Sequence, residues 1–217
     1  MKILIALLLI SLAQNAIAET VTLDFDDLTS PLEQDLARYS SDGYKITSSV
    51  NASNAFLAWG STSTFYSGSA ALAAANFNAL ITLSRADNAI FDFTSIDVET
   101  LFTRQNGFNS LIAPADITFT GVKSDNSLVT QTISISPVTA ISELTTFAIL
   151  GFDDITSVYW AQGGFIPATP FDINQRHQFD NIVVSTNDVN AVPVPAAAWL
   201  FGSSLIGFAG LRRKFKV

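Results

Sequence analysis

Apolar and polar side chains alternate one by one along much of the chain between residues 19 and 186. Val21, Leu23 and Phe25, for example, are separated by threonine and aspartate. The same period of two recurs at Tyr44 and Ile46, Ile81 and Leu83, Ile96 and Val98, Ile117 and Phe119, Val129 to Ile135, Phe147 and Ile149, and His177 to Ser185. Because a strand points successive side chains to opposite faces, this pattern predicts many short, half-buried strands.

Turn-forming residues separate these runs. They are Ser41-Asp42-Gly43, Asp87-Asn88, Ser124 to Ser127, and Gly163-Gly164. One segment, Pro31 to Tyr39, has Leu32, Leu36 and Tyr39 at helical spacing, so we expect one short helix there. Many short strands without a long helix predict an all-β fold for residues 19–186, a jelly-roll-like β-sandwich.

The N-terminus carries an export signal. Lys2 precedes an apolar run from Ile3 to Leu12, and Ala16-Ile17-Ala18 provides a small-x-small cleavage pattern. A run of this length falls short of the ~20 residues that span a bilayer, so a retained anchor is the less favoured alternative. Cleavage after Ala18 makes Glu19 the first mature residue and residues 1–18 the signal peptide.

A second apolar run ends the chain. Ala196 to Leu211 contains only two polar side chains, and four cations follow it in the last six residues. A helix over this run is ~24 Å long, slightly less than the ~30 Å hydrocarbon core, and Val192 to Pro195 can supply the remainder. The basic cluster places the C-terminus in the cytoplasm by the positive-inside rule. We therefore predict a linker over 187–192 and a transmembrane helix over 196–211, with the acidic body outside the cell.

The tail resembles a known sorting signal. Val192, Pro193, Val194 and Pro195 precede Trp199 and Gly202 of the apolar run, and Arg212 and Arg213 close it. Three unlike elements in this order are similar to the PEP-CTERM family, whose tails are recognised by an exosortase. The resemblance implies a transient inner-membrane anchor, then release to the cell surface or extracellular matrix of a Gram-negative bacterium. Val194 stands where that family has its glutamate.

Charge is distributed unevenly along the chain. Residues 19–192 carry six Lys and Arg and all 19 Asp and Glu, a net charge of −13. Such a surface repels the phosphate backbone of nucleic acid, so we expect no nucleic-acid partner. The chain has no cysteine, so a folded, exported body depends on its core, with or without help from a metal ion.

Few residues are candidates for catalysis. His177 is the only histidine, next to Arg176 and Gln178 at a strand start, where we expect it to be solvated. A Ser-His-Asp site would need it, the nucleophile-elbow motif is missing, and one histidine excludes a histidine-based zinc site. A glycoside hydrolase needs only two carboxylates, so such an enzyme stays open as the alternative to a protein without catalytic activity.

Carboxylates on the first and last strands suggest a calcium site. Asp24 and Asp26 flank Phe25, and Asp180 and Asn181 lie in the final strand. Calcium takes ~6–8 oxygen ligands, and these two strands are neighbours in many jelly-roll carbohydrate-binding modules. The competing interpretation is that these side chains face water. We expect no required cofactor and, if calcium binds, a structural role for it.

Aromatic residues next to loop-like sequence are candidates for sugar stacking. Trp59 precedes Gly60-Ser61, Tyr66 follows soon after, and Tyr159-Trp160 lie near Gly163. Aromatic faces suit the apolar C–H groups of sugars. Core packing is the competing interpretation, and if residues 158–160 form a strand, either Tyr159 or Trp160 must face inward. The sequence thus predicts an exported envelope or biofilm-matrix protein, associated with exopolysaccharide and processed by an exosortase-like protease.

Overall fold

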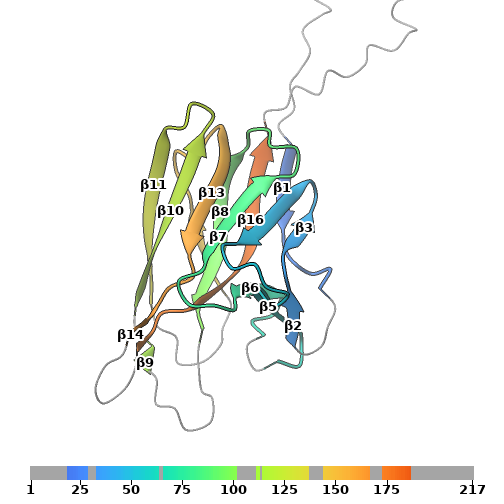
Figure 1. The fold of residues 1–217 in the computed structure, drawn as a ribbon, viewed down its shortest axis with the longest axis vertical. Helices are drawn as coiled ribbons and strands as arrows, with labels where there is room; N and C mark the ends of the chain where they lie inside the picture. The colour runs from blue at the N-terminus through green and yellow to red at the C-terminus, as the bar shows by residue number, and fades with distance from the viewer. Residues whose placement is uncertain are drawn as a thin grey trace, which may run out of the picture. The chain divides into compact units, whose positions relative to one another are not determined.

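Two antiparallel sheets contain most of the strands in the described part of the chain (Figure 1). The computed structural model describes residues 19–28, 33–63, 66–101, 111–112, 114–136, 144–166 and 173–186. These residues form strands, turns and loops, and none of them is helical. Thr20–Thr186 is one compact unit. The predicted all-β sandwich is confirmed at this level, and the finer jelly-roll assignment remains a prediction.

The first sheet, sheet A, has seven strands in the order β12-β8-β16-β6-β5-β2, with β1 paired to β16. Their bounds are β1 (Glu19–Leu23), β2 (Glu33–Leu36), β5 (Phe56–Trp59), β6 (Ala71–Ala74), β8 (Asp92–Thr100), β12 (Thr145–Ala148) and β16 (His177–Thr186). The first and last strands of the body are therefore neighbours, as the sequence predicted. The start of β1 and the end of β16 lie at the same end of the sandwich (Figure 1).

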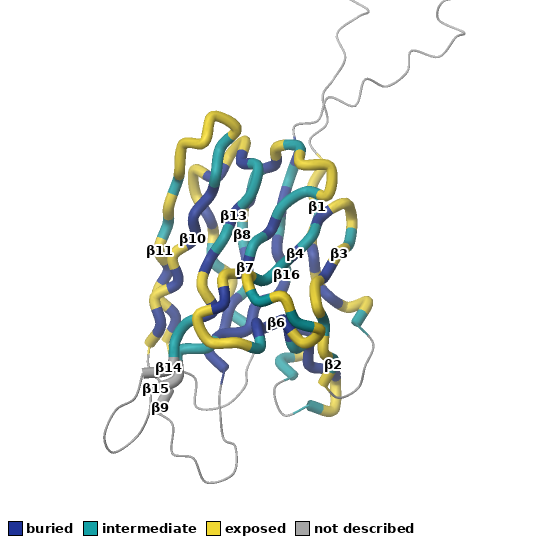
Figure 2. Tube along the Cα trace, in the orientation of Figure 1, coloured by how far each residue is buried: buried dark blue, intermediate teal, exposed yellow. Residues whose placement is uncertain are grey.

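The second sheet, sheet B, has six strands in the order β11-β10-β13-β7-β4-β3. Their bounds are β3 (Tyr39–Ser41), β4 (Tyr44–Ser48), β7 (Leu80–Arg85), β10 (Ala115–Lys123), β11 (Leu128–Ile135) and β13 (Ile155–Ala161). A small third sheet joins β14 (Phe165–Ile166), β15 (Ile173–Asn174) and β9 (Leu111–Ile112). Figure 2 shows buried and more exposed residues alternating along the strands of sheet B.

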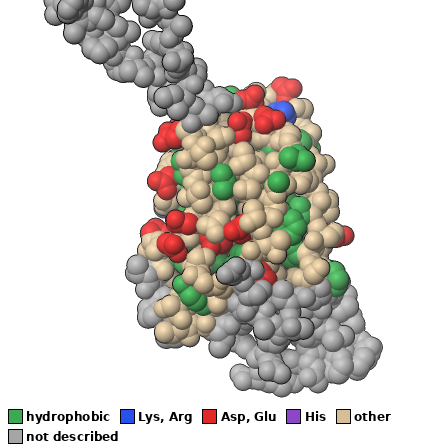
Figure 3. Space-filling view, turned by 180° about the vertical axis from the view of Figure 1, so that it is seen from behind, with side chains coloured by type: hydrophobic (Ala, Val, Ile, Leu, Met, Phe, Trp, Pro, Cys, Tyr) green, Lys and Arg blue, Asp and Glu red, His purple; other side chains and the backbone are tan. Residues whose placement is uncertain are grey.

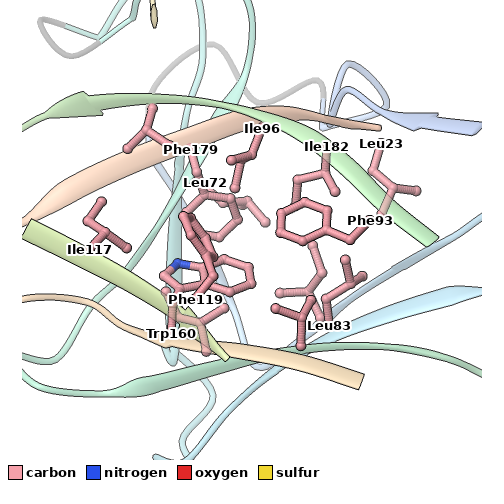
Figure 4. Packing of buried hydrophobic residues seen from close by; sticks show 14 of the residues in the cluster. Leu23, Leu72, Leu83, Phe93, Ile96, Ile117, Phe119, Trp160, Phe179 and Ile182 are labelled. Carbon is pink, nitrogen blue, oxygen red and sulfur yellow. The ribbon is translucent and has the colours of Figure 1, made fainter. Parts of the chain in front are cut away.

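The core lies between sheets A and B and is rich in aromatic rings. Trp160 of β13 meets Phe179 of β16 at a centroid distance of 5.2 Å, edge to face. Phe93 of β8 meets Phe119 of β10 in the same way at 5.7 Å. These rings and the aliphatic side chains around them form one cluster (Figure 4). Burial of this apolar surface is the main force that holds the two sheets together.

The predicted turns are present where left-handed backbone is needed. Ser41 pairs with Tyr44 across a two-residue loop in which Asp42 has φ of 50° and Gly43 has φ of 78°. Two positive φ values in such a loop match the twist of an antiparallel hairpin. Asn88, Asn126 and Gly163 also have positive φ, at 60°, 65° and 88°. The sequence therefore predicted these turns correctly.

Two local predictions were wrong. The segment predicted to be helical contains strands instead, because Glu33 to Leu36 pair with Phe56 to Trp59 and Tyr39 pairs with Ile46. A leucine spacing of four is compatible with either structure, and a distant partner decided between them. The first strand also ends at Leu23, so Asp24 and Asp26 lie in the turn that follows it. Phe25 has φ of 55° in that turn and buries its ring against Tyr39 at 4.7 Å.

Candidate functional site

The two tryptophans predicted to stack on sugars are both buried. Trp160 is 1% exposed in the core between the sheets (Figure 4). Trp59 is 3% exposed and packs with Ala73 and Leu101 in a small second apolar cluster. Its indole nitrogen donates to Glu33 at 3.3 Å. Neither indole presents a face to solvent, so for these residues the interpretation as core packing is the correct one.

The two tyrosines considered for the same role are half-buried. The Tyr66 hydroxyl donates to the backbone oxygen of Gly68 at 2.7 Å, so this side chain is tied to its own loop. Tyr159 lies on β13, one residue before the inward-facing Trp160, and therefore points away from the core. The sequence predicted that either Tyr159 or Trp160 faces inward, and in the structure the inward residue is Trp160.

The residues predicted to bind calcium differ in exposure. Asp24 and Asp26 are exposed, Asn181 is half-buried, and Asp180 is 0% exposed. Asp26 accepts from the Ala70 amide at 3.4 Å. Within the described ranges, no three His, Cys, Asp or Glu side chains lie close enough to hold a metal ion. The pairing of β1 with β16 brings the two acidic segments onto neighbouring strands, and calcium binding there remains a prediction.

Asp180 is the centre of a hydrogen-bonded network on β8 and β16. It lies opposite Asp97 in the strand register. Its Oδ2 is paired with the Ser69 hydroxyl, and its Oδ1 accepts from the Asn181 amide at 2.7 Å. The Asn181 side chain donates to Asp97 at 2.8 Å. These bonds belong to the surface of sheet A that faces away from sheet B, where carboxylates are spread over the molecule (Figure 3).

Burial decides the protonation of Asp180. It raises the pKa of this carboxyl from 3.8 to about 7, and the negative charges of Asp26 and Asp97 act in the same direction. The hydrogen bonds from Ser69 and Asn181 oppose that shift. Near neutral pH the buried carboxyl is therefore divided between its acid and its carboxylate forms.

The prediction that His177 is solvated was wrong. The side chain is 1% exposed and lies opposite Thr100 in the sheet. Burial lowers the pKa of the imidazole to about 3, and the positive charge of Arg176 lowers it further. A neutral ring without access to solvent cannot exchange protons with a substrate, so His177 belongs to the core.

Gln162 connects the two sheets, a role that the sequence did not predict. The side chain is 0% exposed and follows the end of β13. Its oxygen accepts from the Ala74 amide at 3.1 Å, and its nitrogen donates to the His177 carbonyl at 2.6 Å. A glutamine between an alanine and a glycine gives no sequence signal for such a role, because the partners come from distant strands.

The outer surface of sheet B is lined with hydroxyl groups. Across five strands, the register places one row of residues side by side on this side of the sheet: Thr130, Thr120, Tyr159, Thr82 and Thr47. Thr130 is exposed, Tyr159, Thr82 and Thr47 are half-buried, and Thr120 is buried at 9% exposure. A second row contains Ser157 and Ser84, and Thr118 lies next to Thr132, with their hydroxyl oxygens 2.8 Å apart. We call the surface formed by these nine residues the hydroxyl face. The inward rows on the same strands contain core residues such as Val158, Leu83 and Ile46.

The residues of the predicted sorting signal, from Val192 to Arg213, lie outside the described residues. The described ranges contain no helix that is long and apolar enough to cross a membrane.

Comparison with known proteins gives only distant similarities. No family model matches the chain, and no curated protein does. A mutant of CBM29-2, solved to probe ligand recognition by family 29 carbohydrate binding modules, is 13% identical, with a TM-score of 0.42 over 83% of this chain and 94% of that one. A DUF4465 family protein from Bacteroides caccae is 11% identical, with a TM-score of 0.44 over 76% and 98% of the two chains. Similarity at this level establishes neither a family nor a ligand.

Proposed function

We propose that this chain is an exported envelope or biofilm-matrix protein, sorted through a PEP-CTERM-like tail, whose β-sandwich associates with polysaccharide without catalysis. The observation that carries the proposal is the order of three elements in the tail. A Pro-x-Pro segment, an apolar run beginning at Ala196 and a terminal basic cluster follow one another without interruption. The export signal at the other end of the chain agrees with the topology that the tail requires.

The geometry of the sandwich supports attachment at one end. The start of β1 and the end of β16 lie at the same end of the sandwich (Figure 1). A chain that is held through either terminus is therefore attached at this end of the sandwich. This is the arrangement that a module needs in order to contact a polymer outside the cell.

Titratable groups in the described residues support a role without catalysis. Two side chains, Asp180 and His177, have strongly shifted pKa values, and they are 0% and 1% exposed. A general acid or base must come within hydrogen-bond distance of the proton that it transfers. Neither group meets that requirement in this conformation.

Recovery of the native protein from cells tests the proposal. In cells that carry an exosortase, we expect a mature chain that begins at Glu19 and ends near Val192 to Ala196, isolated with the extracellular polysaccharide fraction. The two prolines disfavour helix in the residues that precede them, so we expect this segment to be extended and accessible to a protease. Intact-mass measurement of a chain that still ends at Val217 would contradict the sorting role, and a chain absent from the polysaccharide fraction would contradict the association.

One observation favours a carbohydrate hydrolase as the second candidate. The raised pKa of Asp180, about 7, beside other carboxylates is the titration expected of a catalytic acid, and such an enzyme would need a conformation that exposes this buried side chain. Release of reducing ends from polysaccharide by the wild-type chain, abolished in Asp180→Asn, would favour this enzyme over the binding module.

A further inference from the structure

We propose that the hydroxyl face of sheet B is the surface on which the sandwich binds a neutral polysaccharide chain, with Tyr159 at the centre of the contact. This inference rests on the proposed function and names its site. The two tryptophans predicted to bind sugar are buried. The strand register instead identifies the hydroxyl face, which the sequence alone does not reveal.

The register gives the hydroxyl face a regular spacing. Neighbouring strands lie ~4.8 Å apart, so the five-strand row from Thr130 to Thr47 spans roughly 19 Å. Each threonine hydroxyl both donates and accepts a hydrogen bond, as the hydroxyls of a sugar do. β-Branched side chains on a strand are also restricted in χ1, so holding them against a ligand costs little conformational entropy.

Tyr159 adds an aromatic surface to the middle of this row. It pairs with Thr120 on one neighbouring strand and with Thr82 on the other. The ring is half-buried, with Trp160 taking the adjacent inward position. An aromatic ring offers large contact area and loses only two side-chain torsions on binding. On one side of the ring the neighbouring Thr82 is half-buried, and on the other side the exposed Thr130 lies beyond the buried Thr120. A ring with hydroxyls near it suits a sugar, which has apolar C–H faces and polar edges.

Charge selects a neutral polymer as the occupant. The row of five contains no charged residue, although the body carries a net charge of −13 over residues 19–192. On the same sheet, Asp116 accepts a hydrogen bond from Ser134 at 2.6 Å, and Lys45 donates to Asn88 at 3.4 Å. An anionic polysaccharide would be repelled by the acidic body, and a cationic partner would bind the carboxylates of sheet A.

The test uses the full chain, purified in a mild detergent, and affinity electrophoresis through gels that contain a single polysaccharide. The probes are β-glucan, galactomannan and dextran as neutral polymers and alginate as an anionic one. We expect retardation by at least one neutral polymer and none by alginate. Tyr159→Ala should weaken binding about tenfold, and the isosteric pair Thr82→Val with Thr130→Val should weaken it about as much.

Two control variants make the result specific. Thr22→Val removes an exposed hydroxyl from β1 on the other sheet, and Tyr66→Ala removes the other half-buried tyrosine. Both should bind as the wild type does, and circular dichroism should show that every variant is folded. Tyr159→Phe keeps the ring and should retain most of the affinity.

Each outcome separates the site from the function. A wild type that binds a neutral polymer while the Tyr159 and threonine variants bind equally well overturns the site and leaves the proposed function standing. Loss of binding in Tyr66→Ala alone moves the site away from sheet B and also overturns this inference. Preference for alginate overturns the charge argument. A wild type that binds none of the four polymers contradicts the polysaccharide association itself, and with it the site.

Discussion

Replacing Asp180 by asparagine should stabilise the protein, and the gain should grow as the pH rises. Asparagine has the shape of the protonated acid. Its oxygen can accept from the Asn181 amide, and its NH2 group can donate to Ser69, so both hydrogen bonds of the buried carboxyl are retained. The substitution removes only the negative charge that forms when Asp180 loses its proton beside Asp26 and Asp97.

The magnitude follows from the linkage between protonation and folding. Folding raises the pKa of Asp180 from 3.8 to about 7, so the folded state binds this proton more tightly than the unfolded state does. The resulting stability is fully present below pH 3.8 and is lost as the pH rises through 7. A difference of this size corresponds to about 4 kcal/mol in the free energy of unfolding. Asparagine at position 180 has no proton to lose, so the variant should lose none of this stability as the pH rises.

Urea unfolding of the full chain, followed by the fluorescence of its tryptophans, measures the effect at pH 4.5 and pH 7.5. His177 titrates in the opposite direction over part of this range, so the variant is compared with the wild type at each pH. Asp153→Asn, which removes an exposed carboxylate, controls for net charge. We expect the Asp180→Asn difference to grow by about 3–4 kcal/mol between the two conditions. An equal difference at both pH values would refute burial as the cause of the shift.

Four further predictions concern other positions. Folding lowers the pKa of His177 to about 3, so the contribution of this neutral side chain to stability is complete above pH 6.5 and is lost on acidification. In the same assay, the free energy of unfolding of His177→Leu should therefore fall about 3 kcal/mol less than that of wild type between pH 6.5 and pH 4. Gln162→Leu leaves two buried backbone groups unpaired and should cost about 2–5 kcal/mol, read from the urea midpoint. Gly121→Ala places a Cβ 2.8 Å from Phe152 and Val129 side-chain atoms and should cost about 1–3 kcal/mol, and a midpoint like that of wild type would contradict this packing. If calcium binds the folded chain, a hundredfold excess over Kd should stabilise it by about 2.7 kcal/mol, and an unchanged melting midpoint between millimolar calcium and chelator would end that prediction.

The alternation of apolar residues was sufficient to predict the β-sandwich, because each strand carries its own pattern. Ile81 with Leu83 and Ile117 with Phe119 are buried as predicted. The segment from Glu33 to Leu36 was not predictable in this way, because it is a strand only through its pairing with β5. Local spacing cannot show a pairing partner that lies 20 or more residues away in the sequence.

The sites were harder to predict than the fold. The sequence named Asp180 only as a candidate calcium ligand, and calcium binding there stays a prediction. The hydrogen bonds of Asp180 to Ser69 and to the Asn181 amide could not be foreseen, because they depend on the fold. Trp59 lies beside a glycine and serine segment typical of a loop, and the apolar residues that bury it, Ala73 and Leu101, are distant in sequence. Burial on the outer surface of a sheet depends on such contacts, which periodicity does not reveal.

The exposure of Tyr159 depends on one irregularity in β13. Ile155 and Val158 are both buried although they are three residues apart, which strict alternation does not allow. The register between β10 and β13 shifts at Val122 and Lys123, and Thr156, whose hydroxyl donates to the Val122 carbonyl at 3.0 Å, takes up the extra residue. A β-bulge of this kind re-aims the side chains that follow it. Without the bulge, keeping Ile155 inside would turn Tyr159 into the core and Trp160 out to solvent, because a slip of one residue exchanges the two faces of a strand. The bulge therefore determines both the aromatic residue that fills the core and the aromatic residue that the hydroxyl face presents.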